Sequence, residues 1–520
     1  MNFKRNLVAI KRGLARLSSQ IQKWLRRLIR DIPDWFEALF VREPRPRARW
    51  VFYIWFLALF GAGVYFWGAF FNWGNINFNW HDWAEVTAPR VAFVGNSLRQ
   101  GELPLHMTDS SALRGVTDRY LAIPDVMISP QMLLLLFLDV GQFFLFNTLL
   151  LYTLGALGLL WIARRYKLSA LAVTPLFLLF NFNGHITAHL SVGHENWVGY
   201  FLFPWIVGLL LLLAEGRSSW RFVAVFSGLL FFLLLQGAYH QLVWCLLLLA
   251  LVGLFNWKTL VTVIKVGFFT GLLSLVRLLP PALELGHFDT SFISGYPSLL
   301  NLLQSMVTVQ PATDALEVRM QYNSLGWWEL DLYIGLIGLA FLLIFGLGGW
   351  LHDLHNPDGR ARLLAPVTVM AVLAIGPLWG WMIKILPIPL LTSERVSARV
   401  ISLPFVILLV LAAIYFQDFI DNHVQEYPAR WSLLMPVLPM GLELWSHFQV
   451  WRVSAALKGF PTTPVNLAIK VPANHPDPPY FAALAAGLAV TLLTALFLLY
   501  QVWRERPQTE AVMDRYLGKT

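Results

Sequence analysis

The sequence predicts an all-α membrane protein, a polytopic bundle of about twelve transmembrane helices. The first reason is composition: 57% of the residues are hydrophobic and 13% are charged, whereas soluble domains carry about 25% charged residues. The second reason is that several apolar segments continue for about 18 residues or more, which is enough to cross ~30 Å of hydrocarbon. These runs are continuous rather than alternating, which excludes a transmembrane β-barrel.

The loops between the spans give the bundle an orientation. When the basic amino terminus is placed in the cytoplasm, the connections assigned to that side are short and carry Lys and Arg, as the positive-inside rule requires. Both termini are then expected to be cytoplasmic. Hydropathy places the spans near residues 50–71, 131–163, 170–189, 198–214, 222–237, 240–257, 260–279, 332–350, 363–385, 398–417, 431–446 and 481–503.

The first 49 residues are predicted to form a basic amphipathic helix and a linker. Residues 1–50 hold thirteen Lys and Arg against four Asp and Glu, so they account for the whole net charge of +9. Between Lys4 and Arg30, leucines and isoleucines recur every three to four residues and form one stripe. Such a helix is expected to lie on an anionic lipid surface or to dock on a protein partner. The stripe argues against nucleic-acid binding.

The connections on the opposite, external side are of a different kind. Two are long, 72–130 and 280–331, and a third covers about 447–480; they hold most of the Asp, Glu, His and Trp that lie outside the spans. Functional residues tend to lie on loops held by a rigid scaffold, so the external face is the predicted working face. The spans and loops of 50–420 form the predicted core, and 421–520 a C-terminal segment.

The strongest candidate lies just after the first span, in Trp80-His81-Asp82-Trp83-Ala84-Glu85. Asp82 and Glu85 are three residues apart, so a helical turn would place both carboxylates on one face. A carboxylate there could act as an acid or base on a substrate at the bilayer edge. The alternative is an interfacial anchor, with Trp80 and Trp83 at the level of the lipid headgroups.

Two further groups of polar residues are expected on the same face. His185 and His189 are four residues apart, and with His194 and Glu195 they could form a zinc-type ligand set or donate hydrogen bonds to a phosphate or a sugar. Polar groups at membrane depth usually face the bundle interior, and this applies to the turn between the fifth and sixth spans, which contains Gln236, Tyr239 and His240.

Arg395 and Arg399 precede the tenth span and are four residues apart, which suits a bound phosphate. The alternative is an ion pair within the protein, with Glu394 as one candidate partner. Glu329, at the start of the eighth span, is a further candidate carboxylate beside Asp331. No phosphate-binding glycine loop, dinucleotide fingerprint or serine-hydrolase elbow is present. An energy-requiring reaction would therefore need a substrate that is already activated.

Short motifs follow one another in a definite order between about residues 50 and 420. They are Asp82 with Glu85, Gly101-Glu102-Leu103-Pro104-Leu105, Ser129-Pro130, Gly184-His185, Gln236-Gly237-Ala238-Tyr239-His240-Gln241, Leu279-Pro280-Pro281-Ala282-Leu283-Glu284, Gly326-Trp327-Trp328-Glu329 and Arg395 with Arg399. This order resembles the GT-C superfamily of integral-membrane glycosyltransferases, and within it the YfhO-like bacterial membrane proteins. Beyond residue 420 no similar family is recognised.

The resemblance implies a function. The donor would be a sugar linked to a polyprenyl phosphate, and the acceptor would lie on the external side of a bacterial inner membrane. Asp82 would be the general base, and Arg395 and Arg399 would hold the donor phosphate. The sugar pocket would be lined by His185, His194, Tyr239 and His240. Some members of the superfamily use a divalent metal ion. Two other classes stay open: a non-catalytic membrane subunit or assembly factor on the same fold, and a lipid or polymer transporter.

Overall fold

The computed structural model describes residues 20, 31–287, 294–310, 326–352, 359–424, 427–456, 458, 462–469 and 475–516. Within these residues the chain is helical and forms no β-strand, although four isolated bridges pair short extended segments. The all-α prediction is therefore confirmed. Apart from Gln20, the predicted basic helix of residues 4–30 lies outside the described residues.

Most of the α-helices lie within the apolar segments that hydropathy identifies, and short 3-10 and π turns separate the helices. The α-helices are α2 (Arg49–Phe70), α3 (Ala88–Arg99), α4 (Val140–Arg165), α5 (Ala170–Phe182), α6 (Gly184–Ser191), α7 (Phe203–Ala214), α8 (Trp220–Leu235), α9 (Tyr239–Phe255), α10 (Trp257–Leu273), α11 (Leu275–Ala282), α12 (Leu299–Ser305), α13 (Gly335–Phe341), α14 (Gly349–His352), α15 (Leu364–Leu373), α16 (Gly376–Ile385), α17 (Pro389–Thr392), α18 (Ser402–His423), α19 (Tyr427–Ser432), α20 (Val437–Trp451), α21 (Val453–Ala456) and α22 (Pro478–Tyr516). Of these, α3, α12, α17, α19 and α21 lie wholly or mostly outside the apolar segments.

Seven helices in the described residues are long and apolar enough to cross a membrane, and there are eight if α10 and α11, which are bent by 66°, form one span. This is consistent with a multi-pass membrane protein; the count of twelve stays a prediction. The seven are Pro46–Phe70, Val140–Arg165, Ala170–Ser191, Glu195–Ala214, Gly335–His352, Ser397–His423 and Pro478–Glu505.

The predicted ninth span, 363–385, is not one helix but two of ten residues each, α15 and α16. Hydropathy cannot detect this break because the residues on both sides are apolar. At the break, Ile375 is extended and Gly376 begins the next helix, and the N–H of Gly376 donates to the carbonyl of Tyr296. The interruption is stable because another segment of the chain satisfies the freed backbone groups.

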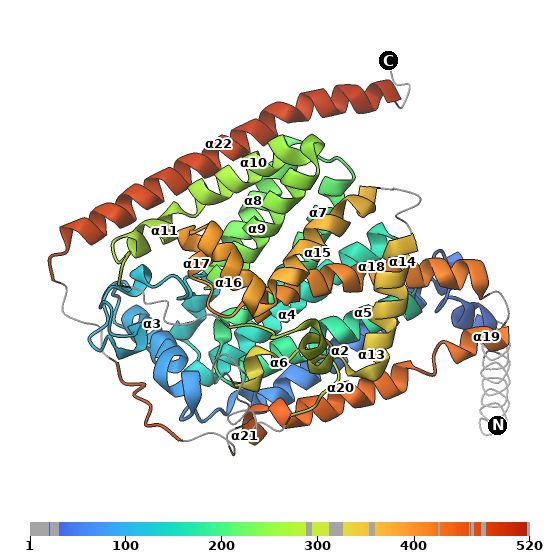
Figure 1. Cartoon of the computed structure of the whole chain (residues 1–520), viewed down its shortest axis with the longest axis horizontal. Coiled ribbons are helices and arrows are strands. Elements are labelled where there is room, and N and C mark those ends of the chain that lie inside the picture. Colours follow the sequence, from blue (N-terminus) through green and yellow to red (C-terminus); the bar gives the residue numbers. More distant parts are fainter. Residues whose placement is uncertain are drawn as a thin grey trace, which may run out of the picture.

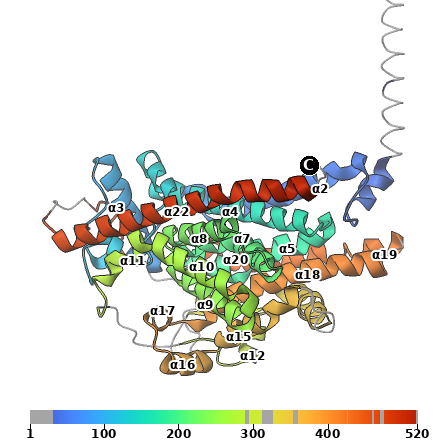
Figure 2. The ribbon, with the colours of Figure 1, turned by 90° about the horizontal axis from the view of Figure 1, so that it is seen from above.

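The helices form a core with a peripheral C-terminal helix (Figures 1 and 2). The span that contains α18 is 94% buried within the protein, and α18 packs against α5, α7 and α15. In Figure 1 α22 lies along α10 and α11 at the edge of the molecule, and its span is only 22% buried. Leucines on α22, among them Leu493 and Leu499, are exposed, as expected of a lipid-facing helix.

A buried carboxylate joins α20 to the loop before α13. Asp331 accepts hydrogen bonds from Trp451 Nε1 at 2.8 Å and from the backbone N–H of Tyr333 at 2.9 Å, and it lies 2.9 Å from His447 Nε2. A Cβ atom added at Gly184 would lie 1.7 Å from Asp331 Oδ1, so only glycine fits there. Asp331 therefore has a structural role and is not a carboxylate of the predicted site.

Asp331→Asn should destabilise the protein. The new amide NH₂ would face the indole N–H of Trp451, which can only donate, and a buried donor left without an acceptor costs about 1–3 kcal/mol. We expect a lower midpoint of thermal unfolding for the detergent-solubilised protein. Asp109→Asn, at an exposed turn, is the control and should change stability by less than about 0.5 kcal/mol. Equal midpoints for the two variants would contradict the structural role of Asp331.

Candidate functional site

A cavity of about 420 Å³ is the centre of the candidate site. Six separate segments of the chain form its walls, and all six belong to the predicted external loops or to the helix ends beside them. The residues that line it are His81, Asp82, Val86, Thr87, Arg90, Val91, Arg114, Tyr120, Asp125, Val126, Met127, Gly193, His194, Glu195, Asn196, Trp197, His240, Gly326, Trp328, Glu329, Arg395, Val396 and Arg399.

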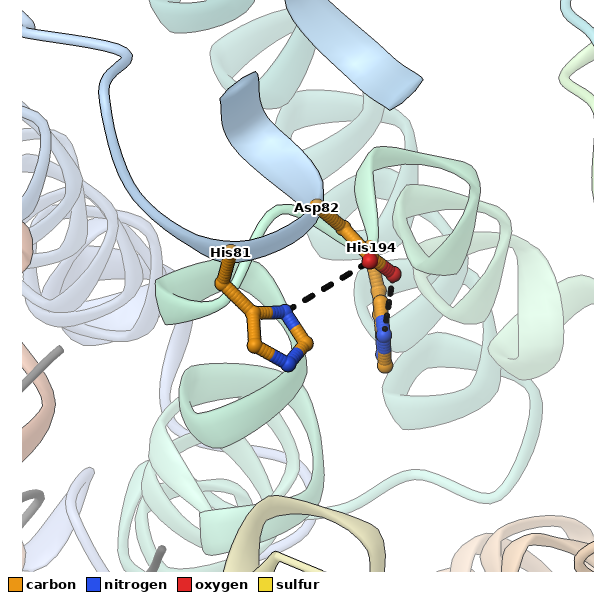
Figure 3. A group of neighbouring side chains, drawn as sticks. All are labelled: His81, Asp82 and His194. Atoms are coloured by element: carbon orange, nitrogen blue, oxygen red, sulfur yellow. Dashed lines mark ion pairs between the residues drawn. The ribbon is translucent and has the colours of Figure 1, made fainter. Parts of the chain in front are cut away.

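On one wall, two histidines flank the carboxylate of Asp82 (Figure 3). His194 Nε2 lies 3.0 Å from Asp82 Oδ2, and His81 Nδ1 lies 3.6 Å from Asp82 Oδ1. On its other side, His194 Nδ1 lies 2.7 Å from His189 Nδ1, so one of these nitrogens donates to the other. Asp82, His194 and His189 thus form a hydrogen-bonded chain that runs from the cavity into the protein interior.

The segment that carries Asp82 is held by backbone carbonyls at the end of α6. The indole N–H groups of Trp80 and Trp83 both donate to the carbonyl of Ser191, at 3.3 and 3.0 Å. Both tryptophans are fully buried within the protein. The prediction that they anchor the chain at the lipid headgroups is therefore wrong: their N–H groups bind carbonyls left unpaired by a helix end.

Gly193 allows the close approach of His194 to Asp82. It has a φ of +97°, a conformation that favours glycine. A Cβ atom at this position would lie 2.4 Å from the backbone nitrogen of Trp83, and the Gly193 carbonyl accepts a 2.6 Å hydrogen bond from the Thr87 hydroxyl. The turn of Gly193 therefore sets the distance between the histidine and the carboxylate.

The electrostatics of this wall favour an ionised carboxylate. Burial raises the pKa of Asp82, but the hydrogen bond from His194 and the positive charges of His194, His81 and Arg114 lower it more, so the pKa is well below its usual value. Burial is also the main influence on His81, and it lowers the pKa of that imidazole. Asp82 is thus ionised at neutral pH.

Arginines line the same cavity. Arg399 Nε and Nη2 donate to the two oxygens of Glu329, both at 2.6 Å, and Arg399 Nη1 lies 3.8 Å from Glu394. Of the two predicted roles, the ion pair is present for Arg399, with Glu329 as its main partner. For Arg395, burial followed by the positive charges of Arg114 and Arg399 lowers the pKa of the guanidinium. This crowding of cations favours a bound anion.

Glu394 connects Arg399 to the turn between α8 and α9. It accepts hydrogen bonds from Trp244 Nε1 at 2.9 Å and from the N–H of Val396, and it lies 3.0 Å from His240 Nδ1. Burial raises its pKa, but the charges of His240 and Arg399 lower it more, to about 2. Glu394 is therefore an ionised support for Arg399.

Seven of the twelve predicted site residues line the cavity. Glu85 is exposed, because it lies in a π turn, Trp83–Thr87, where residues three apart do not share a face. Tyr239 approaches the Ser393 hydroxyl, and Gln236 accepts from Gln131. The seven lining residues are Asp82, His194, Glu195, His240, Glu329, Arg395 and Arg399; the others are Glu85, His185, His189, Gln236 and Tyr239.

Sequence reasoning missed three charged residues of the site. Arg90 donates to Asp125 at 3.1 Å, and Arg114 lies 3.4 Å from the other oxygen of the same carboxylate. The charges of the two arginines, which outweigh burial, hold the pKa of Asp125 well below its usual value. The density of Asp and Arg in the first external loop was the available signal, but solvated loops carry similar charges.

A metal ion fits one group of side chains in the cavity. The ligand atoms of His81, Asp82 and His194 lie within 4.8 Å of one another. The zinc-type set predicted from His185, His189, His194 and Glu195 is not one of the candidate groups found in the described residues. One reason is that His189 Nδ1 and His194 Nδ1 point at each other and form a hydrogen bond.

Comparison of the sequence with models of protein families and with curated proteins found no match.

Gly193→Ala should disrupt the site, and Gly101→Ala should not. Both glycines have positive φ, +97° and +74°, so each alanine costs about 1–2 kcal/mol in backbone conformation. A Cβ at Gly101 has nothing within 4 Å, whereas one at Gly193 meets the backbone of Trp83. We expect a clearly larger fall in thermal stability for Gly193→Ala. A similar fall in both variants would contradict the proposed close packing.

Proposed function

We propose that this protein is a membrane glycosyltransferase, which transfers a sugar from a polyprenyl-phosphate donor to an acceptor hydroxyl at the external face of a bacterial inner membrane. The observation that carries the proposal is that a carboxylate, Asp82, and an arginine group, Arg395 with Arg114, line one cavity. Sugar transfer with inversion at the reacting carbon uses a base on the acceptor hydroxyl and cations on the departing phosphate. The GT-C fold, twelve spans and cytoplasmic termini belong to the same proposal.

In this reaction Asp82 is the general base. The acceptor hydroxyl becomes strongly acidic only as its oxygen bonds to the sugar carbon, so a weakly basic carboxylate is able to accept the proton at that stage. The low pKa of Asp82 keeps it ionised and ready to accept. His194 holds the carboxylate in place, and His189 behind it fixes the orientation of the imidazole.

The arginines bind the donor phosphate, which is the leaving group. Negative charge grows on its oxygen as the glycosidic bond breaks, and fixed cationic donors stabilise that charge. Arg395 and Arg114 are the proposed phosphate ligands, because both line the cavity and their positive charges lie near each other. Arg399 then contributes its positive charge to the cavity while it stays paired with Glu329. His240, Trp197 and Trp328 also line the cavity and are the proposed contacts of the sugar.

A divalent metal ion, which some members of the superfamily use, would be held by His81, Asp82 and His194, whose ligand atoms are close enough to share it. When bound, such an ion would polarise a coordinated hydroxyl or phosphate oxygen. Without it, the same histidines orient and ionise Asp82. The non-catalytic subunit and the transporter remain the alternative proposals, and the following experiments distinguish them from the enzyme.

Asp82→Asn should abolish transfer. Loss of a general base lowers the rate about 10²–10⁴-fold, and we expect this loss when the purified variant is assayed in proteoliposomes with a panel of polyprenyl-phosphate hexoses and pentoses. Glu85→Gln is the matched control, because this carboxylate is exposed on the same helical turn, outside the cavity. Unchanged transfer by Asp82→Asn would remove Asp82 as the base; no transfer by the native protein with any donor favours the other two classes.

Arg395→Ala should weaken binding of a polyprenyl phosphate. One charge-assisted hydrogen bond contributes about 1.5–3 kcal/mol, so we expect the dissociation constant to rise about tenfold or more in a binding titration. Arg217→Ala, at an exposed position after α7, is the control. Equal affinities for the two variants would eliminate the proposed phosphate site.

His194→Gln should move the acidic limb of the pH–activity profile upward. In the native protein His194 lowers the pKa of Asp82, so the base stays ionised below the usual Asp value of about 3.9. Removal of the imidazole charge leaves the effect of burial, which raises the pKa, so Asp82 protonates at a higher pH. His240→Gln, which changes the partner of Glu394 instead, should leave the limb in place.

A further inference from the structure

We propose that His106, Asp118 and His475 form a binding site for a divalent transition-metal ion, with zinc the best match, where the first external loop meets the segment before α22. His475 Nε2 lies 3.0 Å from Asp118 Oδ2, and His106 Nδ1 lies 3.2 Å from the same oxygen. All three ligand atoms lie within 4.8 Å of one another. None of these residues lines the cavity around Asp82.

The spacing suits a tetrahedral ion. Zinc binds imidazole nitrogen at about 2.0–2.1 Å and carboxylate oxygen at about 2.0–2.2 Å, and ligands at tetrahedral angles are then roughly 3.3 Å apart. The measured separations of 3.0 and 3.2 Å are close to this value. Two histidines and an aspartate form a common zinc ligand set, and water completes the fourth position.

The burial of His106 and its unsatisfied ring nitrogens are independent evidence for a bound ligand. Its side chain is 2% exposed, and neither ring nitrogen forms a hydrogen bond, although Asp118 is near. A buried imidazole with both nitrogens unsatisfied is costly in a folded protein. Coordination of a cation by Nδ1 would satisfy one of them.

The other ring nitrogen already faces a supporting carboxylate. His106 Nε2 lies 3.7 Å from Asp477 Oδ2, and Asp477 accepts two hydrogen bonds from Arg119, at 2.7 and 2.9 Å. Histidines that bind metals usually direct their second nitrogen at a carboxylate, which fixes the tautomer and the ring orientation. A small movement of His106 toward Asp477 would complete this arrangement.

The backbone brings the ligands together from distant parts of the chain. An isolated antiparallel bridge pairs His106 with Arg119, and the N–H of Met107 donates to the Asp118 carbonyl at 2.7 Å. The hydroxyl of Tyr480 then donates to the carbonyl of Leu105 at 3.2 Å, which joins the start of α22 to the same bridge. His475 precedes this contact by five residues.

A metal ion at this position would fasten α22 to the loop that supplies Arg114, Tyr120 and Asp125 to the cavity. Asp118 and His475 are partly exposed, so an ion can enter from solvent. The site would therefore brace one wall of the cavity without taking part in the reaction there. This inference does not depend on the proposed glycosyltransferase activity.

The test is zinc binding by the full-length protein in detergent. His194→Ala is introduced into every variant, because His194 belongs to the other candidate group. In this background we expect one zinc ion per chain in competition with a chromogenic chelator, and at least tenfold weaker binding after Asp118→Asn or His475→Ala. His287→Ala is the matched control: His287 is exposed and lies 3.1 Å from a carboxylate, Glu284, in no candidate metal group of the described residues.

Two further measurements make the result decisive. Cobalt substituted for zinc should show the visible absorption of a tetrahedral ion, which His475→Ala should remove and His475→Cys should restore, since a thiolate is also a zinc ligand. Unchanged zinc affinity in Asp118→Asn and His475→Ala would overturn the proposal and would mean an adventitious ion only. The absence of bound zinc at micromolar free zinc in the protein that carries only His194→Ala would overturn it as well.

Discussion

The candidate site depends on how the end of α6 satisfies its backbone carbonyls. A helix leaves its last carbonyls without helical partners, and inside a membrane protein water cannot replace those partners. Here side chains from the segment after α2 take their place: two tryptophans donate to Ser191, His81 contacts Val192 at 3.2 Å, and Thr87 donates to Gly193. These contacts bring Asp82 against His194, so the same hydrogen bonds stabilise the fold and assemble the carboxylate–histidine pair.

A second constraint is the compensation of charge around the cavity. Arg399 pairs with Glu329, and Arg90 and Arg114 both contact Asp125. The carboxylate of Glu394 lies within hydrogen-bonding distance of three nitrogen atoms. Breaking a buried pair leaves an uncompensated charge, which is strongly destabilising. Several arginines of the cavity therefore have structural partners already. Arg395 lies near the positive charges of Arg114 and Arg399.

The predictability of the site differs between its parts for physical reasons. The sequence assigned His194, Glu195, His240, Glu329 and the arginine pair to the same face as Asp82, and these residues line one cavity with it. His185, His189, Gln236 and Tyr239 were assigned to that face too and do not line the cavity. The roles of Glu85 and of the two tryptophans were not accessible in the same way. The exposure of Glu85 follows from a π turn. The roles of Trp80 and Trp83 depend on the carbonyl of Ser191, which is 111 and 108 residues away in the chain. Local sequence patterns contain neither fact.

Sequence alone determined the all-α class and the apolar segments, because hydrophobic burial and the length of an apolar run depend only on which residues are adjacent in the chain. It also indicated which loops supply ionisable residues to the cavity, because ionisable groups are excluded from lipid. Tertiary structure decided where an apolar run breaks, as at Ile375, which carboxylate faces the cavity, and which arginines are already paired. These outcomes depend on contacts between segments that are far apart in the chain. The free energy of such a contact depends on both partners, so neither segment alone predicts it.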